Sequence, residues 1–196
     1  MARPKSEDKR DALLAAATRV IAAQGLSGPT AVIAREAGVS NGSLFTYFET
    51  KADLFNQLYL NLKTGMAAVS LNGLPDQAPL REQFSRMWSN WTRWATSNPD
   101  QRRVLALLDV SDDIAPPTRA ASHQAMAEIA GMLERARACG PMRDAPMEFV
   151  SAIMDSLAET TMDFMVNDPA HADEHCRVGF DALCRMLGFL FLSAYK

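Results

Sequence analysis

Small and polar side chains crowd one stretch in the first quarter of the chain, and their types suit contact with nucleic acid. Asn41 can pair bidentately with adenine, and the hydroxyls of Ser43 and Thr46 can meet several bases or a phosphate. Gly42 beside them would let the backbone come close to a DNA groove. The stretch is therefore a candidate base-reading surface, with Tyr47 as its last outward-facing residue.

Lys51 follows at a position that is electrostatically unusual for a lysine. We expect a helix to begin at Thr50, with Asp53 three residues later as a variant of the capping box. A cation in the first turn of that helix opposes the helix dipole, whereas a bound phosphate would remove the conflict. Thr50, Lys51 and the backbone N–H groups of this turn would then face one anion.

Two short helices joined by a tight turn would hold the polar side chains in place. The first is expected over residues 31–37, with Thr30 as its candidate N-cap and Gly38 as its end. Ser40 is the natural N-cap of the second, over residues 41–48. This is the layout of a helix-turn-helix, which places its second helix in the DNA major groove. The alternative is a small helical bundle whose polar residues are merely solvated.

A preceding helix, expected over residues 7–24, supplies an apolar stripe on which both short helices can pack. The stripe consists of Leu13, Leu14, Ala17, Val20 and Ile21. The apolar residues expected to face it are Ile33, Ala34, Ala37, Leu44 and Phe48. Packing of these two sets against each other would turn the polar residues of the second short helix outward.

Charge is divided unevenly along the 196 residues. Residues 1–51 carry seven basic and five acidic side chains, a net charge of +2, whereas the whole chain carries −3, which leaves −5 for the rest. A basic head on an acidic body lets only one end approach phosphates. Apolar residues make up 48% of the chain, which excludes disorder, and the longest apolar run, residues 186–192, is too short to span a bilayer. We expect a cytoplasmic protein with no membrane partner.

Cysteine and histidine residues give no strong sign of a disulfide, a metal site or an enzyme. Cys139, Cys176 and Cys184 are odd in number and widely spaced, which is typical of a protein from a reducing compartment. His171 and His175 have the i, i+4 spacing that can bind zinc or nickel, but polar residues are expected at a helix start in any case. The sequence lacks the nucleophile-elbow, zinc-protease and phosphate-loop motifs. We expect no enzyme activity, no metal and no cofactor.

Helical periodicity runs through the chain, and no stretch shows the sustained alternation of a β-strand. Proline and glycine residues divide the part after residue 50 into separate helices. The predicted fold class is all-α, with nine helices in total. The last six are expected over residues 50–69, 80–97, 100–112, 118–138, 146–167 and 170–194.

Aromatic and methionine side chains in the long C-terminal part suit an adaptable apolar pocket. Four aromatic residues form a ridge on the helix expected over residues 80–97, and methionines lie on the helices that would surround it. The alternative is ordinary core packing. The candidate pocket residues are Met66, Phe84, Trp88, Trp91, Met126, Met154 and Met162.

The last two expected helices, residues 146–167 and 170–194, carry more apolar surface than one core needs. The final helix has two apolar faces, and both would be buried if two copies of the chain paired these helices in a four-helix bundle. The alternative is a purely monomeric core. The candidate interface residues are Leu157, Phe164, Phe180, Leu183, Leu187 and Leu190.

The segment IAREAGVSNGSLFTYFETKADL resembles the DNA-binding domain of TetR-family transcriptional regulators. The resemblance covers about residues 10–58. It implies a helix-turn-helix domain over residues 1–50 and a helical ligand-binding and dimerisation domain over residues 51–196. It further implies a homodimeric regulator, expected to be a repressor, that binds a palindromic double-stranded operator. A small apolar or amphipathic ligand would release it.

Carried over by position, the resemblance also assigns contacts with DNA. Thr30 and Lys51 fall on phosphate contacts, and the helix between them falls on base and backbone contacts. Phe45 stands where the family commonly has tyrosine, so one hydroxyl is missing. The expected DNA-binding residues are Thr30, Ser40, Asn41, Gly42, Ser43, Phe45, Thr46, Tyr47 and Lys51. The alternative, from another class, is a small-molecule-binding or interaction module with a vestigial DNA-binding head.

Overall fold

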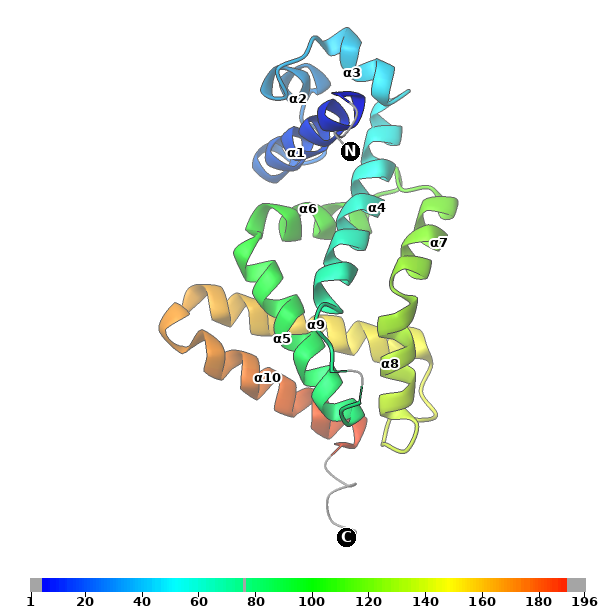
Figure 1. Ribbon diagram of the computed structural model, residues 1–196, viewed down its shortest axis with the longest axis vertical. Helices are drawn as coiled ribbons and strands as arrows, with labels where there is room; N and C mark the ends of the chain where they lie inside the picture. Colours follow the sequence, from blue (N-terminus) through cyan, green and yellow to red (C-terminus); the bar gives the residue numbers. More distant parts are fainter. Residues whose placement is uncertain (1–4, 76, 190–196) are drawn as a thin grey trace. The chain divides into compact units, whose positions relative to one another are not determined.

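A computed structural model describes residues 5–75 and 77–189, and these residues form helices with no strand among them. The predicted all-α class is therefore confirmed. The helices are labelled in Figure 1. Their bounds are α1 Lys5–Gln24, α2 Thr30–Glu36, α3 Asn41–Tyr47, α4 Lys51–Ser70, α5 Leu80–Ser97, α6 Pro99–Asp109, α7 Pro116–Ala125, α8 Ala127–Arg137, α9 Met147–Asn167, the 3-10 helix η1 Pro169–His171 and α10 Ala172–Leu187.

Two prolines begin helices in the middle of the chain. α6 starts at Pro99 and α7 at Pro116, each a little before the predicted start. Proline is tolerated in the first turn because its missing N–H would have no partner inside the helix there. Proline therefore marks the first residue of these helices and not a gap in front of them.

One expected long helix is divided in two. The helix predicted over residues 118–138 is interrupted at Met126, which separates α7 from α8 and has φ −92° and ψ 0°. The described residues therefore contain ten α-helices where nine were predicted. Neither proline nor glycine occupies the interruption, so the rule used to divide the sequence could not find it.

The last helix is shorter than predicted at both ends. A 3-10 turn over Pro169–His171 precedes α10, and α10 ends at Leu187 because Gly188 adopts φ +88°. That left-handed conformation ends an α-helix and favours glycine, which has no Cβ to clash. The prediction of one continuous helix to residue 194 is therefore wrong, because α10 ends at Leu187 and Gly188 is its C-cap. The candidate interface residue Leu190 lies outside the described residues.

The chain divides into two compact units, which we call the head unit and the body unit. The head unit comprises Met1–Thr64 and Asn98–Gln124, and the body unit comprises Gly65–Ser97 and Ala125–Lys196. The head unit thus continues beyond the expected DNA-binding segment, residues 1–50, and includes α6 and most of α7. The helix α4 contributes residues to both units.

In the head unit, α1 packs against α2 and α6, and α2 packs against α3 (Figure 1). The predicted stripe on α1 is buried, with Leu13 and Ala17 fully inaccessible to solvent. Ile33 of α2 and Leu44 of α3 are also fully buried. The predicted burial is therefore confirmed for these residues, whereas Ala37, which was expected to face the same stripe, is only partly buried.

In the body unit, α9 and α10 run side by side, and α5 packs on both (Figure 1). Trp88 of α5 is fully buried in this core and donates a hydrogen bond from Nε1 to the carbonyl oxygen of Cys176, 3.1 Å away. Gly179 of α10 allows the close approach, because a Cβ there would lie 2.3 Å from Oγ1 of Thr161 and 3.1 Å from the ring of Trp88. The three helices are therefore packed too tightly at this level to admit a larger side chain.

Candidate DNA-binding surface

The turn between α2 and α3 is fixed by backbone and side-chain hydrogen bonds. Gly38 has φ +71° and ends α2, and the N–H of Val39 bonds back to the carbonyl of Ala34 at 2.9 Å. Ser40 then caps α3, because its Oγ accepts a hydrogen bond from the N–H of Ser43 at 3.1 Å. The predicted N-cap of α3 is therefore confirmed, and the chain enters α3 in one defined direction.

The N-cap predicted for α2 is wrong. Thr30 is the first residue of the helix, and Pro29 occupies the N-cap position with no side-chain capping bond. The partly buried side chain of Thr30 therefore lies one position further into the helix than expected. Its proposed phosphate contact is not affected by this change, since the first turn of a helix still presents N–H groups.

One side of α3 is buried and the other is open to solvent. Leu44 and the following Phe48 are fully buried. The exposed residues on the opposite side are Asn41, Gly42, Phe45 and Thr46, and the partly buried ones are Ser43 and Tyr47. Thr46 donates to the carbonyl of Ser43 at 2.8 Å, which is a bond within the helix. The polar groups expected to face DNA are therefore accessible on one short helix.

The first turn of α4 forms the predicted capping arrangement with one difference. The N–H of Asp53 donates to Oγ1 of Thr50 at 3.0 Å, as in a capping box. The carboxylate of Asp53 accepts in return from the N–H of Glu49 at 3.0 Å, one residue before the capping residue. Lys51 lies with its Nζ 5.4 Å from the ring centroid of Phe55, a cation–π contact on its own helix.

Four of the candidate pocket residues lie within one core cluster of the body unit, and two border it. Phe84, Trp88, Met154 and Met162 are buried in that cluster, with Trp91 and Met126 packed against it. Met66 is also buried. This is the packing that either a closed pocket or an ordinary core would have. A hollow of about 300 Å³ lies elsewhere on the body unit, lined by Cys139, Gly140, Pro141, Arg143 and Asp144.

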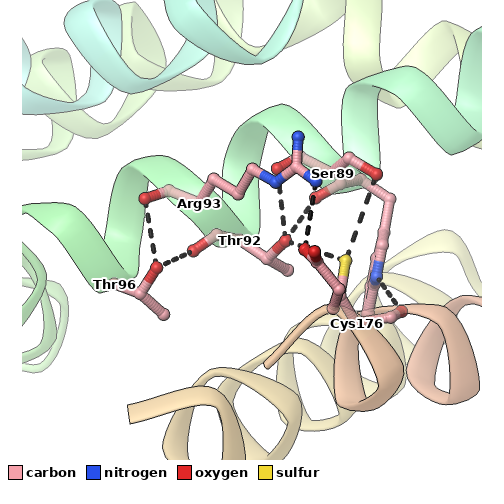
Figure 2. Close-up of polar contacts among 7 residues, drawn as sticks. Ser89, Thr92, Arg93, Thr96 and Cys176 are labelled. Carbon is pink, nitrogen blue, oxygen red and sulfur yellow. Dashed lines mark hydrogen bonds and ion pairs between the residues drawn. The ribbon is translucent and has the colours of Figure 1, made fainter. Parts of the chain in front are cut away.

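The core of the body unit also contains polar groups that the sequence did not single out. Figure 2 shows Ser89 and Thr92 facing the thiol of Cys176, with their Oγ and Oγ1 atoms 4.0 and 3.4 Å from Sγ. Thr92 is fully buried, and its hydroxyl also bonds to the carbonyl of Trp88 at 2.9 Å. The i, i+3 spacing of Ser89 and Thr92 beside the aromatic ridge was a signal for this inward polar strip.

The candidate interface residues separate into two groups. Phe180, Leu183 and Leu187 are buried inside a single chain, where they pack in the core of the body unit. Phe164 is 56% exposed and Leu157 is partly buried, so these two have surface to offer a partner. Further exposed apolar residues on α9 and α10 are Phe149, Val166 and Val178.

Asp168, between α9 and α10, accepts hydrogen bonds from two histidines. Its carboxylate lies 3.0 Å from Nδ1 of His171 and 3.0 Å from Nε2 of His175. The hydrogen bond from His171, followed by that from His175, lowers the pKa of Asp168, and the bond with Asp168 raises the pKa of His171. Within residues 5–75 and 77–189, no group of three histidine, cysteine or acidic residues is arranged to hold a metal ion.

The buried cysteines differ from the exposed Cys139. Cys176 and Cys184 are buried, and burial raises the pKa of the Cys184 thiol. A raised pKa lowers the population of the reactive thiolate at neutral pH.

No helix in the described part of the chain is long and apolar enough to cross a membrane.

Comparison with known proteins gives a family match over most of α1, all of α2 and α3, and the start of α4. Residues 13–58 match the family model of bacterial regulatory proteins of the tetR family. The chain is also similar to an uncharacterized HTH-type transcriptional regulator from Haemophilus influenzae, with 26% identity over 98 residues, which are 50% of this chain and 52% of that protein. The match thus spans about half the length of that curated relative.

Solved structures share the fold over most of the chain. A protein from Shewanella sp. PV-4 assigned to the tetR family of transcription regulators has 26% identity and a TM-score of 0.80, covering 89% of this chain and 95% of its own. A TetR family transcription regulator from Marinobacter aquaeolei VT8 has 21% identity and a TM-score of 0.81, covering 92% and 95%. The TetR-like regulator LfrR from Mycobacterium smegmatis, solved in complex with proflavine, has 18% identity and a TM-score of 0.66, covering 89% and 94%.

Proposed function

We propose that the chain is a ligand-responsive repressor of the TetR family of bacterial regulatory proteins, whose family model matches residues 13–58. It binds a palindromic operator as a homodimer and releases it when a small molecule occupies the body unit. The observation that carries the proposal is the exposed side of α3 with its polar residues. Ser40 caps this helix at its start, and the opposite side is fixed by the fully buried Leu44. A helix presented in this way fits the major groove of DNA.

The residues of the exposed side have distinct proposed roles. Asn41 at the start of α3 reads a base, and Ser43 and Thr46 contact base edges or phosphates. Lys51 and Thr50 in the first turn of α4 hold one phosphate, to which the helix N-terminus is also attracted. Base contacts supply sequence preference, whereas phosphate contacts fix the orientation of the protein on the duplex.

The apolar surface of α9 and α10 supports the homodimer. Helical spacing places Phe149, Leu157 and Phe164 along one stripe of α9, and the first and last of these are each 56% exposed. Val178 of α10 is 51% exposed. The ring of His175 on the same helix packs near the ring of Phe164, with 5.5 Å between the ring centroids. Several exposed apolar residues on two helices that pack together are typical of an interface. A two-fold dimer would present two copies of α3 to two half-sites.

The body unit supports a ligand-controlled release. Its core combines methionine and aromatic side chains with the buried hydroxyl and thiol of Thr92 and Cys176. The structural neighbour LfrR was solved with proflavine, which supports a small-molecule role for a body of this fold. A ligand releases DNA only if it binds the released arrangement more tightly than the DNA-binding one. Bound ligand must then lower the affinity for the operator, and bound operator must lower the affinity for the ligand by the same factor.

Selection of duplexes from a random pool by the purified chain tests the proposed function. We expect a palindrome that binds far more tightly than a scrambled duplex of the same length at physiological salt. Weak binding without an enriched motif would contradict the repressor. If mass spectrometry of the denatured protein also found no bound ligand, a module with a vestigial DNA-binding head would be the better description.

Two matched variants test the proposed dimer. Phe164→Glu places a charge on the apolar surface of α9, whereas Val110→Glu places one on an 83% exposed apolar residue of the head unit. Light scattering at micromolar concentration should find dimers for the unaltered chain and for Val110→Glu, and monomers for Phe164→Glu. A monomeric unaltered chain would contradict the homodimer.

A further inference from the structure

A series of hydrogen bonds in the head unit leads from α1 to the turn between α3 and α4. Arg10 of α1 donates from Nε and Nη2 to Oε1 of Gln57, at 3.1 and 2.6 Å. Nε2 of Gln57 donates to Oδ1 of Asp53 at 2.9 Å. Oδ2 of Asp53 accepts from the N–H of Glu49 at 3.0 Å, and the N–H of Asp53 donates to Thr50. We call these side chains, Arg10, Gln57 and Asp53, the α1–α4 relay.

Each member of the relay determines how the next one is oriented. An amide group can turn either its oxygen or its nitrogen toward a neighbour. Because Arg10 holds Oε1 of Gln57, the NH₂ group must face Asp53, where it donates to the carboxylate. The other carboxylate oxygen is then directed to the backbone of Glu49. All three side chains are partly buried, so water competes less for these bonds than on an open surface.

The last bond of the relay fixes a backbone segment that connects two proposed DNA contacts. Phe48 leaves α3 with φ −137° and ψ 116°, and α4 begins at Lys51. Only Glu49 and Thr50 therefore separate the extended residue from the new helix, and Asp53 bonds to both of them. Their conformation sets the direction of α3 relative to the first turn of α4.

We propose that Gln57 and Asp53, oriented by Arg10, are positioning residues for DNA binding that touch no DNA themselves. They hold the turn at Glu49 so that α3 and Lys51 engage one duplex together. This inference rests on the proposed DNA contacts of α3 and Lys51. Loss of the relay lets the turn adopt other conformations, and binding then has to order it again at a cost in affinity.

Gln57→Met tests the relay without changing any charge. We expect affinity for the duplex recovered by selection to fall about 3- to 10-fold, the effect of one hydrogen bond of ordinary net strength. Gln83→Met is the matched control, because Gln83 is also partly buried and donates one bond, to the carbonyl of Ala78 in the body unit. The control should bind the duplex with unchanged affinity, and thermal unfolding shows whether both variants fold.

Asp53→Ala tests the relay through the sign of its effect. Removal of an acidic side chain near phosphates should strengthen binding if only long-range charge matters. The relay predicts weaker binding, because the N–H of Glu49 and the amide of Gln57 lose the carboxylate that both bond to, while the backbone bond from residue 53 to Thr50 is kept. Tighter binding by Asp53→Ala would overturn the inference.

The double variant with Lys51→Ala completes the experiment. If Gln57 acts through the phosphate contact of Lys51, then Gln57→Met should cost less than about 2-fold once that contact is gone. An undiminished effect, or no effect of Gln57→Met while Lys51→Ala weakens binding, would overturn the inference and leave the proposed function intact. An unaltered chain with no preference for any duplex would overturn both.

Discussion

Hydroxyl side chains have opposite surroundings in the two units of this chain, open to solvent in one and buried in the other. In the head unit, Ser40 and Thr46 bond to α3 itself on a surface where Asn41 and Thr46 are exposed to solvent. In the body unit, Thr92 is fully buried, bonds to the backbone of its own helix and contacts the thiol of Cys176 (Figure 2). The comparison teaches that substitutions on α3 should change DNA binding, whereas substitutions around α5 should change stability.

Trp88→Ala should produce the largest effect on stability. It removes a fully buried indole and its bond to the carbonyl of Cys176, and we expect a loss of about 3–5 kcal/mol in the free energy of unfolding. Urea unfolding measures this loss, with the partly buried Trp91→Ala as the control of smaller effect. Equal effects of the two variants would mean that Trp88 borders a space able to relax, such as a ligand pocket.

Gly179→Ala should have the next largest effect, because there is no room for its methyl group. The new Cβ would lie 2.3 Å from Oγ1 of Thr161, and overpacking of this kind costs about 1–3 kcal/mol. Gly65→Ala is the matched control, since the same change on α4 meets no atom within 4 Å and should stabilise the helix by about 0.5–1 kcal/mol. Thermal unfolding should therefore shift in opposite directions, and shifts of the same sign would contradict the packing described for the body unit.

Ser40→Ala, in the head unit, should have a smaller effect on stability than the two substitutions in the body unit. It removes the bond from the N–H of Ser43 that caps α3, which costs about 1 kcal/mol. Because α3 also carries the proposed base contacts, DNA affinity should fall together with stability. Ser40→Asp restores a capping oxygen and should recover the stability, as monitored by urea unfolding. A destabilised Ser40→Asp would show that the cap is not the cause.

The smallest effect on stability is expected from the ion pair of His171 with Asp168, because both side chains are largely exposed to solvent. The raised pKa of His171 adds stability that is complete below its ordinary value of 6.5 and lost as the pH rises through the folded-state pKa. The lowered pKa of Asp168 adds stability that is complete above its ordinary value of 3.8 and lost as the pH falls through the folded-state pKa. The difference in melting temperature between the unaltered chain and Asp168→Asn should therefore be greatest between these two values. A difference that does not vary with pH would contradict the ion pair.

The head unit could be predicted in detail because its signals are local. Gly38, Ser40 and the apolar spacing of α2 and α3 act within a few residues of the features they determine, and each has the predicted role. The exception is Thr30, where proline took the N-cap position. The relay could not be predicted, because Arg10 and Gln57 are 47 residues apart and meet only after α1 packs.

The body unit could be predicted only in outline. Its helices followed from proline and glycine positions, with two exceptions: the interruption at Met126, which has no such residue, and the end of α10 at Leu187, before Gly188, where the prediction continued the helix. The two apolar faces of the last helix could not be assigned to core or partner by spacing alone. Packing decides this, and it buried Phe180 and Leu183 within one chain and left Val178 exposed. The candidate pocket remains a prediction for the same reason.

The central claim is that α3 reads bases while the first turn of α4 holds a phosphate. The most direct test is titration of Asn41→Ala and Lys51→Ala with the selected duplex and with a scrambled one, over a range of salt concentrations. Lys51→Ala should weaken binding to both duplexes and reduce the salt slope by about 1. Asn41→Ala should cost about 1–3 kcal/mol on the selected duplex alone and leave the slope unchanged. Equal losses of specificity in both variants, or no loss in either, would contradict the account.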